Sequence, residues 1–260
     1  MKLSDKNAVV FGCNSSIAKA ICKKLSAEGC KIIISDLKND IAEQLSSEIN
    51  NAVGVGVDVR IEKDVKKVIN LALEKFGKID VAINCSRAAL FKETMELSEK
   101  EWDTIVHFNT KSMYLIAKTV LRNMIENNSG SIIGITSKAA KSGPANLSSY
   151  AASMNASIGL LKSLSCEVRN NNIKVNALCP GYIEHEELAL GAELTGNTPP
   201  DKGIYLQFSP FIDVTEEPEA LANIVAYLVS DEGRFITGQA YHLCDDDVTY
   251  WRNLGLEAEM

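Results

Sequence analysis

The 260-residue sequence is poor in the residue patterns that bind metals or form disulfide frameworks. It has three histidines and seven cysteines, and no CxxC pair occurs. We therefore expect no metal site, and an odd number of scattered cysteines predicts reduced, buried thiols. The acidic run at 245–247 lacks the spaced ligands of a calcium loop, so we expect a solvated turn there.

Long apolar runs and basic clusters are also missing. No stretch approaches the roughly 20 apolar residues that span a bilayer, so we expect no membrane contact. The net charge is −7 and no group of lysines and arginines stands out, which argues against nucleic acid as a partner. The first residues lack the apolar core of a signal peptide. These absences predict a cytoplasmic protein with a small-molecule substrate.

What the sequence does contain is a regular alternation of short apolar runs and amphipathic stretches. Apolar strands separated by helices of ten or more residues predict an α/β fold, specifically a single-domain Rossmann fold over residues 1–260. We expect a doubly wound parallel sheet of about seven strands flanked by helices. The predicted strands are 8–11, 32–34, 53–57, 81–83, 131–136, 173–178 and 240–243. The predicted helices are 17–25, 41–49, 65–76, 101–125, 150–169 and 218–229.

One segment, 182–214, breaks this rhythm. It is weakly periodic and rich in glycine, proline and acids, so we predict a loop insertion that acts as a substrate lid. Its aromatic residues are candidate apolar walls of a substrate pocket, and its acids would disfavour an anionic substrate if they faced inward. The aromatics are Tyr205, Phe208 and Phe211, and the acids are Glu184, Glu186, Glu187 and Glu193.

The first strand–loop–helix unit carries a weak phosphate-binding pattern. Glycines in such a loop allow a tight turn and close approach to a diphosphate, and of three expected glycines only Gly12 remains. Ser16 and Ala18 stand where the other two would be, so a plain connector is the open alternative. Asp36 follows the second strand, 24 residues after Gly12. An acid there can bind ribose hydroxyls and repel a 2′-phosphate, which favours NAD over NADP, or it can cap the next helix.

The order of motifs along nearly the whole chain resembles the short-chain dehydrogenase/reductase family. The motifs are the Gly12 loop, Asp58-Val59, Asn84-Cys85-Ser86, Asn109, Ser137, Tyr150, Asn176-Ala177, Pro180-Gly181 and 236–239. Ser137 and Tyr150 are 13 residues apart, a spacing seen in many members.

The resemblance implies roles for individual residues. Tyr150 would be the catalytic acid/base, Ser137 would orient the substrate carbonyl, and Asn109 would hold a water. The implied cofactor-binding residues are Gly12, Asn14, Ser15, Ser16, Ile17, Asp36, Asp58, Val59, Asn84, Cys85, Pro180, Gly181 and Ile183. Tyr150 and Ser137 could instead be packing residues, and Asn109 could bridge backbone groups at a helix kink. The resemblance also implies a homo-oligomer, either a dimer or a tetramer.

The departures from the family pattern concern the same pocket. Met154 stands where the family has the lysine of its Tyr-x-x-x-Lys motif, and Ser86 replaces a glycine. That lysine lowers the tyrosine pKa from an ordinary value near ~10, and methionine has neither charge nor donor. A neutral phenol can donate a proton but not accept one, so we expect reduction rather than oxidation. We expect Lys138 and Lys141 to be solvated surface charges that do not replace it.

The sequence thus predicts an oxidoreductase with an altered catalytic set that reduces a carbonyl with NADH, or runs the reverse reaction. The alternative is a pseudoenzyme of the same fold that serves as a binding, scaffold or regulatory subunit and needs no cofactor. A third reading is non-redox catalysis by Tyr150 and Ser137.

Overall fold

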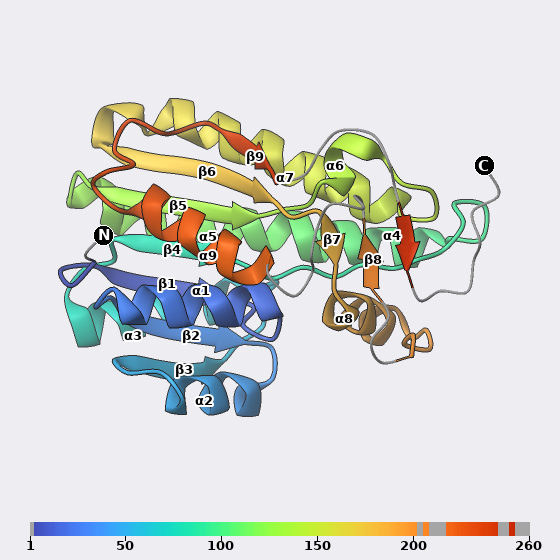
Figure 1. The fold of residues 1–260 in the computed structure, drawn as a ribbon, viewed down its shortest axis with the longest axis horizontal. Helices are drawn as coiled ribbons and strands as arrows, with labels where there is room; N and C mark the ends of the chain where they lie inside the picture. Colours follow the sequence, from blue (N-terminus) through green and yellow to red (C-terminus); the bar gives the residue numbers. More distant parts are fainter. Residues whose placement is uncertain (1–2, 202–204, 208–216, 244–249, 253–260) are drawn as a thin grey trace.

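A seven-stranded parallel sheet forms the centre of the computed structural model, which describes residues 3–201, 205–207, 217–243 and 250–252 (Figure 1). The strands lie in the order β3-β2-β1-β4-β5-β6-β9. They are β1 (Asn7–Phe11), β2 (Lys31–Asp36), β3 (Ala52–Gly56), β4 (Val81–Asn84), β5 (Gly130–Ile135), β6 (Ile173–Cys179) and β9 (Ala240–His242). This arrangement confirms the predicted doubly wound α/β fold.

Helices cover both faces of the sheet, because its strands are apolar on both sides. One face packs against α1 (Ser16–Ala27), α2 (Asn39–Ser47) and α9 (Glu217–Val229). Figure 1 looks onto α1 and α9, which lie in front of the strands. The other face packs against α3 (Glu62–Phe76), α5 (Ser112–Glu126) and α7 (Ser148–Glu167). None of the helices in the described part of the chain is long and apolar enough to cross a membrane.

The remaining elements are short or lie outside the main sheet. They are α4 (Glu99–Val106), α6 (Ala139–Ser142), α8 (His185–Thr195), a π-helical turn η1 (His107–Lys111) and a 3-10 turn η2 (Arg169–Asn171). A small antiparallel sheet joins β7 (Tyr182–Ile183), β8 (Tyr205–Gln207) and β10 (Tyr250–Arg252).

Two sequence predictions need correction. The single helix predicted over 101–125 is two α-helices joined by η1, because a π-turn does not interrupt the apolar pattern. The segment 182–214 is not a structureless loop, since it contains β7, α8 and β8. Helix α8 begins with a capping box between Glu184 and Glu187 and ends at Gly196, which has a positive φ of 75°. The side chain of Tyr205 and residues Phe208, Phe211 and 245–247 lie outside what the structure describes.

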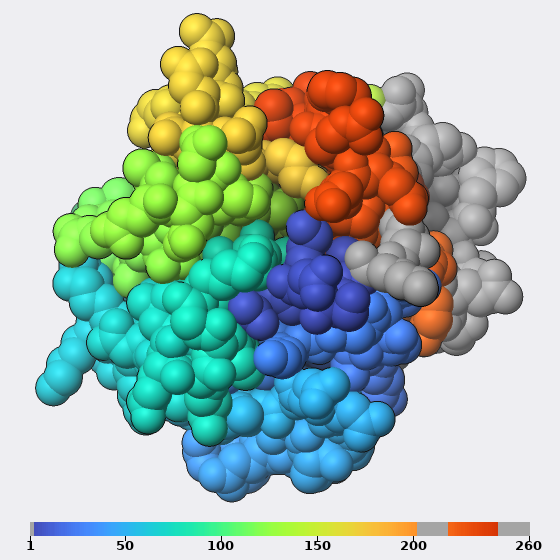
Figure 2. Space-filling view, turned by 90° about the vertical axis from the view of Figure 1, so that its left-hand side faces the viewer, coloured from blue at the N-terminus to red at the C-terminus, as the bar shows by residue number. Residues whose placement is uncertain are grey.

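The topology of the sheet creates one place at its edge where a ligand can bind. The chain leaves β1 toward β2 on one side, and β4 lies on the other side, so the helices that follow β1 and β4 lie on opposite faces of the sheet. In open α/β sheets such a switch point forms a crevice at the carboxyl ends of the strands. The opposite edge, formed by the amino ends of the strands, faces the viewer in Figure 2.

Candidate active site

A pocket lies at this switch point, between the strand ends and helix α8. It brings together residues from the loops after β1, β2, β3 and β4 with the first turns of α8. Its walls include Gly12, Asn14, Ser15, Asp36, Val57, Val59, Ser86, Arg87, Phe108, His185 and Glu187. Gly12 and Asp36, two of the implied cofactor-binding residues, thus line one pocket.

The loop after β1 is held tightly against the loop after β4. Gly12 has φ of 76°, and a β-carbon on it would lie 2.5 Å from the backbone nitrogen of Ser86. Both the positive φ and the close approach require glycine at this position. The loop leads into α1, whose N-cap is Ser15, and the Ala18 amide donates to the Ser15 hydroxyl over 3.2 Å.

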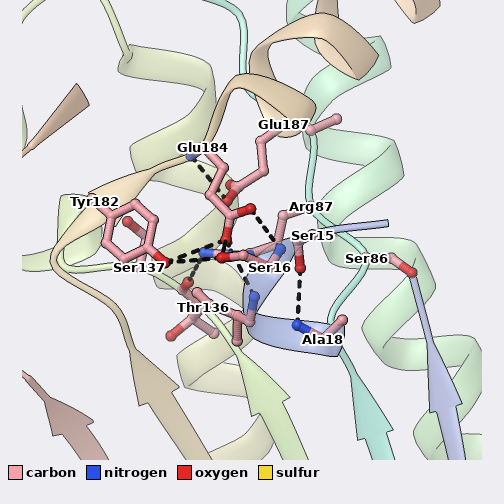
Figure 3. Close-up of polar contacts among 12 residues, drawn as sticks. Ser15, Ser16, Ala18, Ser86, Arg87, Thr136, Ser137, Tyr182, Glu184 and Glu187 are labelled. Atoms are coloured by element: carbon pink, nitrogen blue, oxygen red, sulfur yellow. Dashed lines mark hydrogen bonds and ion pairs between the residues drawn. The ribbon is translucent and has the colours of Figure 1, made fainter. Parts of the chain in front are cut away.

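The N-terminus of α1 binds a carboxylate from the chain itself. The Ser16 amide and hydroxyl donate to the two oxygens of Glu184, each over 2.8 Å, and the Ile17 amide donates over 3.4 Å. Figure 3 shows the Glu184 carboxylate between Ser16 and Tyr182. Unpaired amides and the helix dipole make such a terminus an anion site, so Ser16 keeps this property without the expected glycine.

Asp36 lies at the end of β2 with its carboxylate in the pocket. It accepts hydrogen bonds from the amides of Asn14 and Lys38, both over 3.1 Å. Burial raises its pKa, against the opposing effect of these bonds. Lys38, not Asp36, is the N-cap residue of α2, so the capping alternative for Asp36 is wrong.

Of the next predicted residues, Val59 lines the same pocket, while Asp58 and Asn84 lie outside its lining. Asp58 forms an ion pair with Arg60 over 2.6 Å, while Val59 is buried and lines the pocket with Phe108. Asn84 accepts a hydrogen bond from the Ser86 amide over 2.9 Å, which shapes the loop after β4.

Cys85 lies between Asn84 and Ser86 in this loop. It is buried, and burial raises the pKa of its thiol to about 12. A thiol that stays protonated is a poor nucleophile, so its contribution is packing.

The three predicted catalytic residues lie close together. Ser137 follows the carboxyl end of β5, Tyr150 lies on α7 and Asn109 lies on η1. Tyr150 and Ser137 are fully buried, and the Ser137 hydroxyl accepts a hydrogen bond from the Ala139 amide over 3.1 Å. Burial and the Glu187 carboxylate raise the pKa of Tyr150 well above its ordinary range, while Arg87 and Ser137 lower it.

Asn109 braces the backbone of the loop after β4. Its side-chain oxygen accepts from the Ala88 amide over 2.9 Å, and its side-chain nitrogen donates to the Ala88 carbonyl and to the Ser153 hydroxyl. The two contacts with Ala88 are the backbone contacts of the bridging alternative, and the second amide hydrogen of Asn109 goes to the Ser153 side chain.

Sequence reasoning missed a buried ion pair in the centre of this site. Arg87 and Glu187 approach to 2.8 Å, with side chains only 1% and 3% exposed. The phenol of Tyr150 donates to the other oxygen of Glu187 over 2.9 Å. Burial raises the pKa of Glu187 to about 7, Arg87 lowers it, and Glu184 raises it further. The sequence held one signal for this ion pair, the capping box Glu184-x-x-Glu187. It marks the start of a helix within the segment predicted as a loop.

The surroundings of Tyr150 are otherwise apolar. Met154, at the position of the family's lysine, is buried in one cluster with Tyr150, Ile183 and Leu188. Lys138, predicted to be solvated, is in fact fully buried, because its backbone is held against the loop after β6, where its amide donates to the Pro180 carbonyl over 2.9 Å.

Other predicted features of the pocket can be placed briefly. Lys141 is exposed, as predicted. Pro180 and Gly181 link β6 to β7 beside this cluster, and both are buried. Over the described ranges, no group of three or more histidine, cysteine, aspartate or glutamate residues could hold a metal ion.

Comparisons with known proteins agree with this geometry. A family model described as enoyl-(acyl carrier protein) reductase matches residues 12–245. The 3-oxoacyl-(acyl-carrier-protein) reductase of Vibrio cholerae is 30% identical over 245 residues, covering 94% of this chain and 97% of the relative. The corresponding reductase of Thermotoga maritima is 28% identical over 243 residues, covering 92% and 96%.

A solved structure supports the fold alone. The crystal structure of NAD⁺-bound xylitol dehydrogenase has a TM-score of 0.78 and 23% sequence identity, and the match covers 94% of this chain and 99% of that one.

Proposed function

This chain belongs to the short-chain dehydrogenase/reductase family of oxidoreductases, and from that premise we propose that it reduces a carbonyl group with NADH, or runs the reverse reaction. The observation that carries the proposal is that the Gly12 loop and Asp36 line one pocket with Glu187, whose carboxylate accepts the hydrogen bond of Tyr150. The relatives named above are reductases, which agrees with the reaction class. We treat residues 1–260 as one domain that forms a dimer or tetramer in the cytoplasm.

The residues of the crevice fit a nicotinamide dinucleotide. The N-terminus of α1 already holds a carboxylate, which stands in for a phosphate of the same charge sign. Asp36 offers oxygens to a ribose, and Val57, Val59 and Phe108 offer an apolar wall to a base. A buried negative charge at position 36 disfavours a 2′-phosphate, so NADH is the proposed form.

The proposed chemistry divides between the cofactor and the side chains. The bound dinucleotide supplies the hydride. Tyr150 donates a proton to the substrate oxygen, and Ser137 orients that oxygen. Since Met154 carries no charge, the positive charge near Tyr150 comes from Arg87, which lowers the phenol pKa from the side of β4.

The present arrangement has to change before a substrate carbonyl can reach Tyr150. The phenol already donates to Glu187, so that carboxylate must leave first. Even then a buried phenol next to one guanidinium stays mostly protonated at neutral pH. It can serve as an acid but not as a base, which favours reduction over alcohol oxidation.

Titration of the purified protein with NADH, NAD⁺, NADPH and NADP⁺ by calorimetry tests the proposal. We expect dissociation constants for NADH in the micromolar range and weaker binding of NADPH. If no form binds at concentrations near ~1 mM, the chain is no dehydrogenase.

The pseudoenzyme alternative keeps one specific observation in its favour. Glu184 and Glu187 occupy the anion site of α1 and the hydrogen bond of Tyr150. A subunit that has lost catalysis would keep these contacts in the presence of every dinucleotide, so the same titration separates the two functions.

A further inference from the structure

Arg87 is a buried cation in the active site. The function proposed above gives it no direct contact with the substrate. Its Nη1 atom donates to the Thr136 carbonyl over 3.0 Å, and its Nη2 atom pairs with Glu187. Its Nε atom is buried and has no hydrogen-bond partner among the described residues. A guanidinium removed from water needs an anion and is costly without one.

One carboxylate group connects this cation to the catalytic phenol. The Oε1 atom of Glu187 lies 2.8 Å from Arg87, and its Oε2 atom accepts from Tyr150 over 2.9 Å. The guanidinium and the phenol therefore bind two oxygens attached to a single carbon. Any molecule that replaces Glu187 must present two oxygens close together, one of them negatively charged.

Dinucleotide binding would remove Glu187 from this place. Glu184 and Glu187 belong to the same first turn of α8, where the Glu184 amide donates to Glu187 over 3.4 Å. A phosphate at the N-terminus of α1 needs the Ser16 amide, which Glu184 now holds. Because the two glutamates are tied together, displacement of Glu184 also draws Glu187 away from Arg87. This step rests on the proposed function.

We propose that Arg87 binds a carboxylate of the substrate and that the substrate is a 2-oxo acid. Its carboxylate takes the place of Glu187 on Arg87, and its carbonyl oxygen, on the adjacent carbon, accepts the hydrogen bond of Tyr150. A 3-oxo acid places its carbonyl one carbon further away and fits the same pair of donors less well.

This assignment replaces the earlier expectation that acids of the segment would exclude anions. Glu184 and Glu187 do face inward, and Glu187 serves as a removable counter-charge for Arg87.

The reaction balances with groups already named. The carbonyl carbon takes a hydride from NADH, which becomes NAD⁺, and the carbonyl oxygen takes the phenolic proton of Tyr150. The carbon–oxygen double bond becomes a carbon–hydrogen and an oxygen–hydrogen bond, giving a 2-hydroxy acid. Tyr150 regains its proton from water once α8 has moved.

Binding of unreactive analogues tests the assignment by calorimetry, with and without saturating NADH. Oxamate has the two adjacent oxygens and the charge, malonamate is one carbon longer, and ethyl oxamate lacks the charge. With NADH present, we expect oxamate to bind at least about tenfold more tightly than either of the others. Equal affinity of oxamate and its ester would overturn the proposal.

Two variants test the role of Arg87. Arg87→Met together with Glu187→Leu removes both partners of the buried pair, which such pairs tolerate better than loss of one. It should abolish the preference for oxamate over the ester. Glu187→Gln keeps Arg87 and removes its internal competitor, so oxamate should bind more tightly even without NADH. Unchanged oxamate affinity in both variants would refute the role of Arg87.

The outcomes separate this proposal from the proposed function. If NADH binds and oxamate does not, the substrate assignment fails and the dehydrogenase function stands. If oxamate binds through Arg87 and no dinucleotide binds, the carboxylate site stands and the dehydrogenase function fails. If neither binds, both are wrong.

Discussion

Glu184→Gln should tighten NADH binding, because it removes the internal competitor for the anion site of α1. The glutamate donates nothing and accepts from the Ser16 amide, the Ser16 hydroxyl and the Ile17 amide. Glutamine keeps the size and one acceptor but loses the charge. A partly buried charge at a helix N-terminus contributes about 1–2 kcal/mol, and charged hydrogen bonds are roughly twice as strong as neutral ones.

This free energy is what the dinucleotide must overcome in the parent protein. Its loss should lower the dissociation constant for NADH about 5- to 30-fold, at about 1.4 kcal/mol per factor of ten. Glu193→Gln is the matched control, because Glu193 carries the same charge and also lines the pocket but makes no contact with α1. Glu193 is half exposed and paired with Lys38 over 3.0 Å, so its loss should change NADH affinity less than about twofold.

Calorimetric titration of the parent protein and the two variants with NADH tests whether Glu184 competes with the cofactor. Unchanged or weaker NADH binding in Glu184→Gln would show that Glu184 does not compete with the cofactor. An equal gain in Glu193→Gln would trace the effect to the general charge of α8 rather than to the contact with α1.

Three further substitutions test other parts of the site. Burial raises the pKa of Glu187 to about 7, so the folded protein holds a proton that the unfolded chain releases above about pH 4.5. The free energy of unfolding should therefore fall by up to about 3 kcal/mol between pH 4.5 and 7. Urea titrations should show a smaller fall in Glu187→Gln, and identical slopes would contradict this. Met154→Lys should not restore a typical site but destabilise the fold by about 2–4 kcal/mol, because the ammonium enters an apolar cluster. Met154→Leu is its control, and comparable denaturation midpoints for all three proteins would count against the argument. Asp36→Ala should reduce the preference for NADH over NADPH at least about tenfold, and an unaltered ratio in parallel titrations would mean that Asp36 does not contact the ribose.

The fold could be predicted from the sequence because its strands are continuous apolar runs and the apolar residues of its helices recur with a clear helical period. Helix α8 was not predicted because the residues at its buried positions are few and small. Gly191 has no room for a side chain against the backbone of Ala89, and Leu188 and Ala192 are its main buried apolar residues. Acids in its first turn stabilise the helix, but in the sequence they resemble a polar loop.

The sequence predicted those parts of the site that the topology of the sheet alone determines. Parallel strands bring Gly12, Asp36, Ser137 and their neighbours to one edge of the sheet whatever their side chains do. The contact of Glu184 with Ser16, 168 positions apart, has no local signature. Periodicity reports local structure, so it carries no information on which acid meets which amide.

The missing lysine and the additional arginine can be understood as one change in how charge is supplied to Tyr150. A lysine on α7 would act permanently, since it would lie one helical turn from the phenol. Arg87 comes from the loop after β4, and Glu187 neutralises it as long as α8 is docked. Arg87 already lowers the pKa of Tyr150, but the docked Glu187 opposes this effect and holds the phenol in a hydrogen bond until the first turn of α8 moves. Catalytic competence would then depend on occupation of the crevice, which explains how buried carboxylates and a dehydrogenase fold can occur in one site.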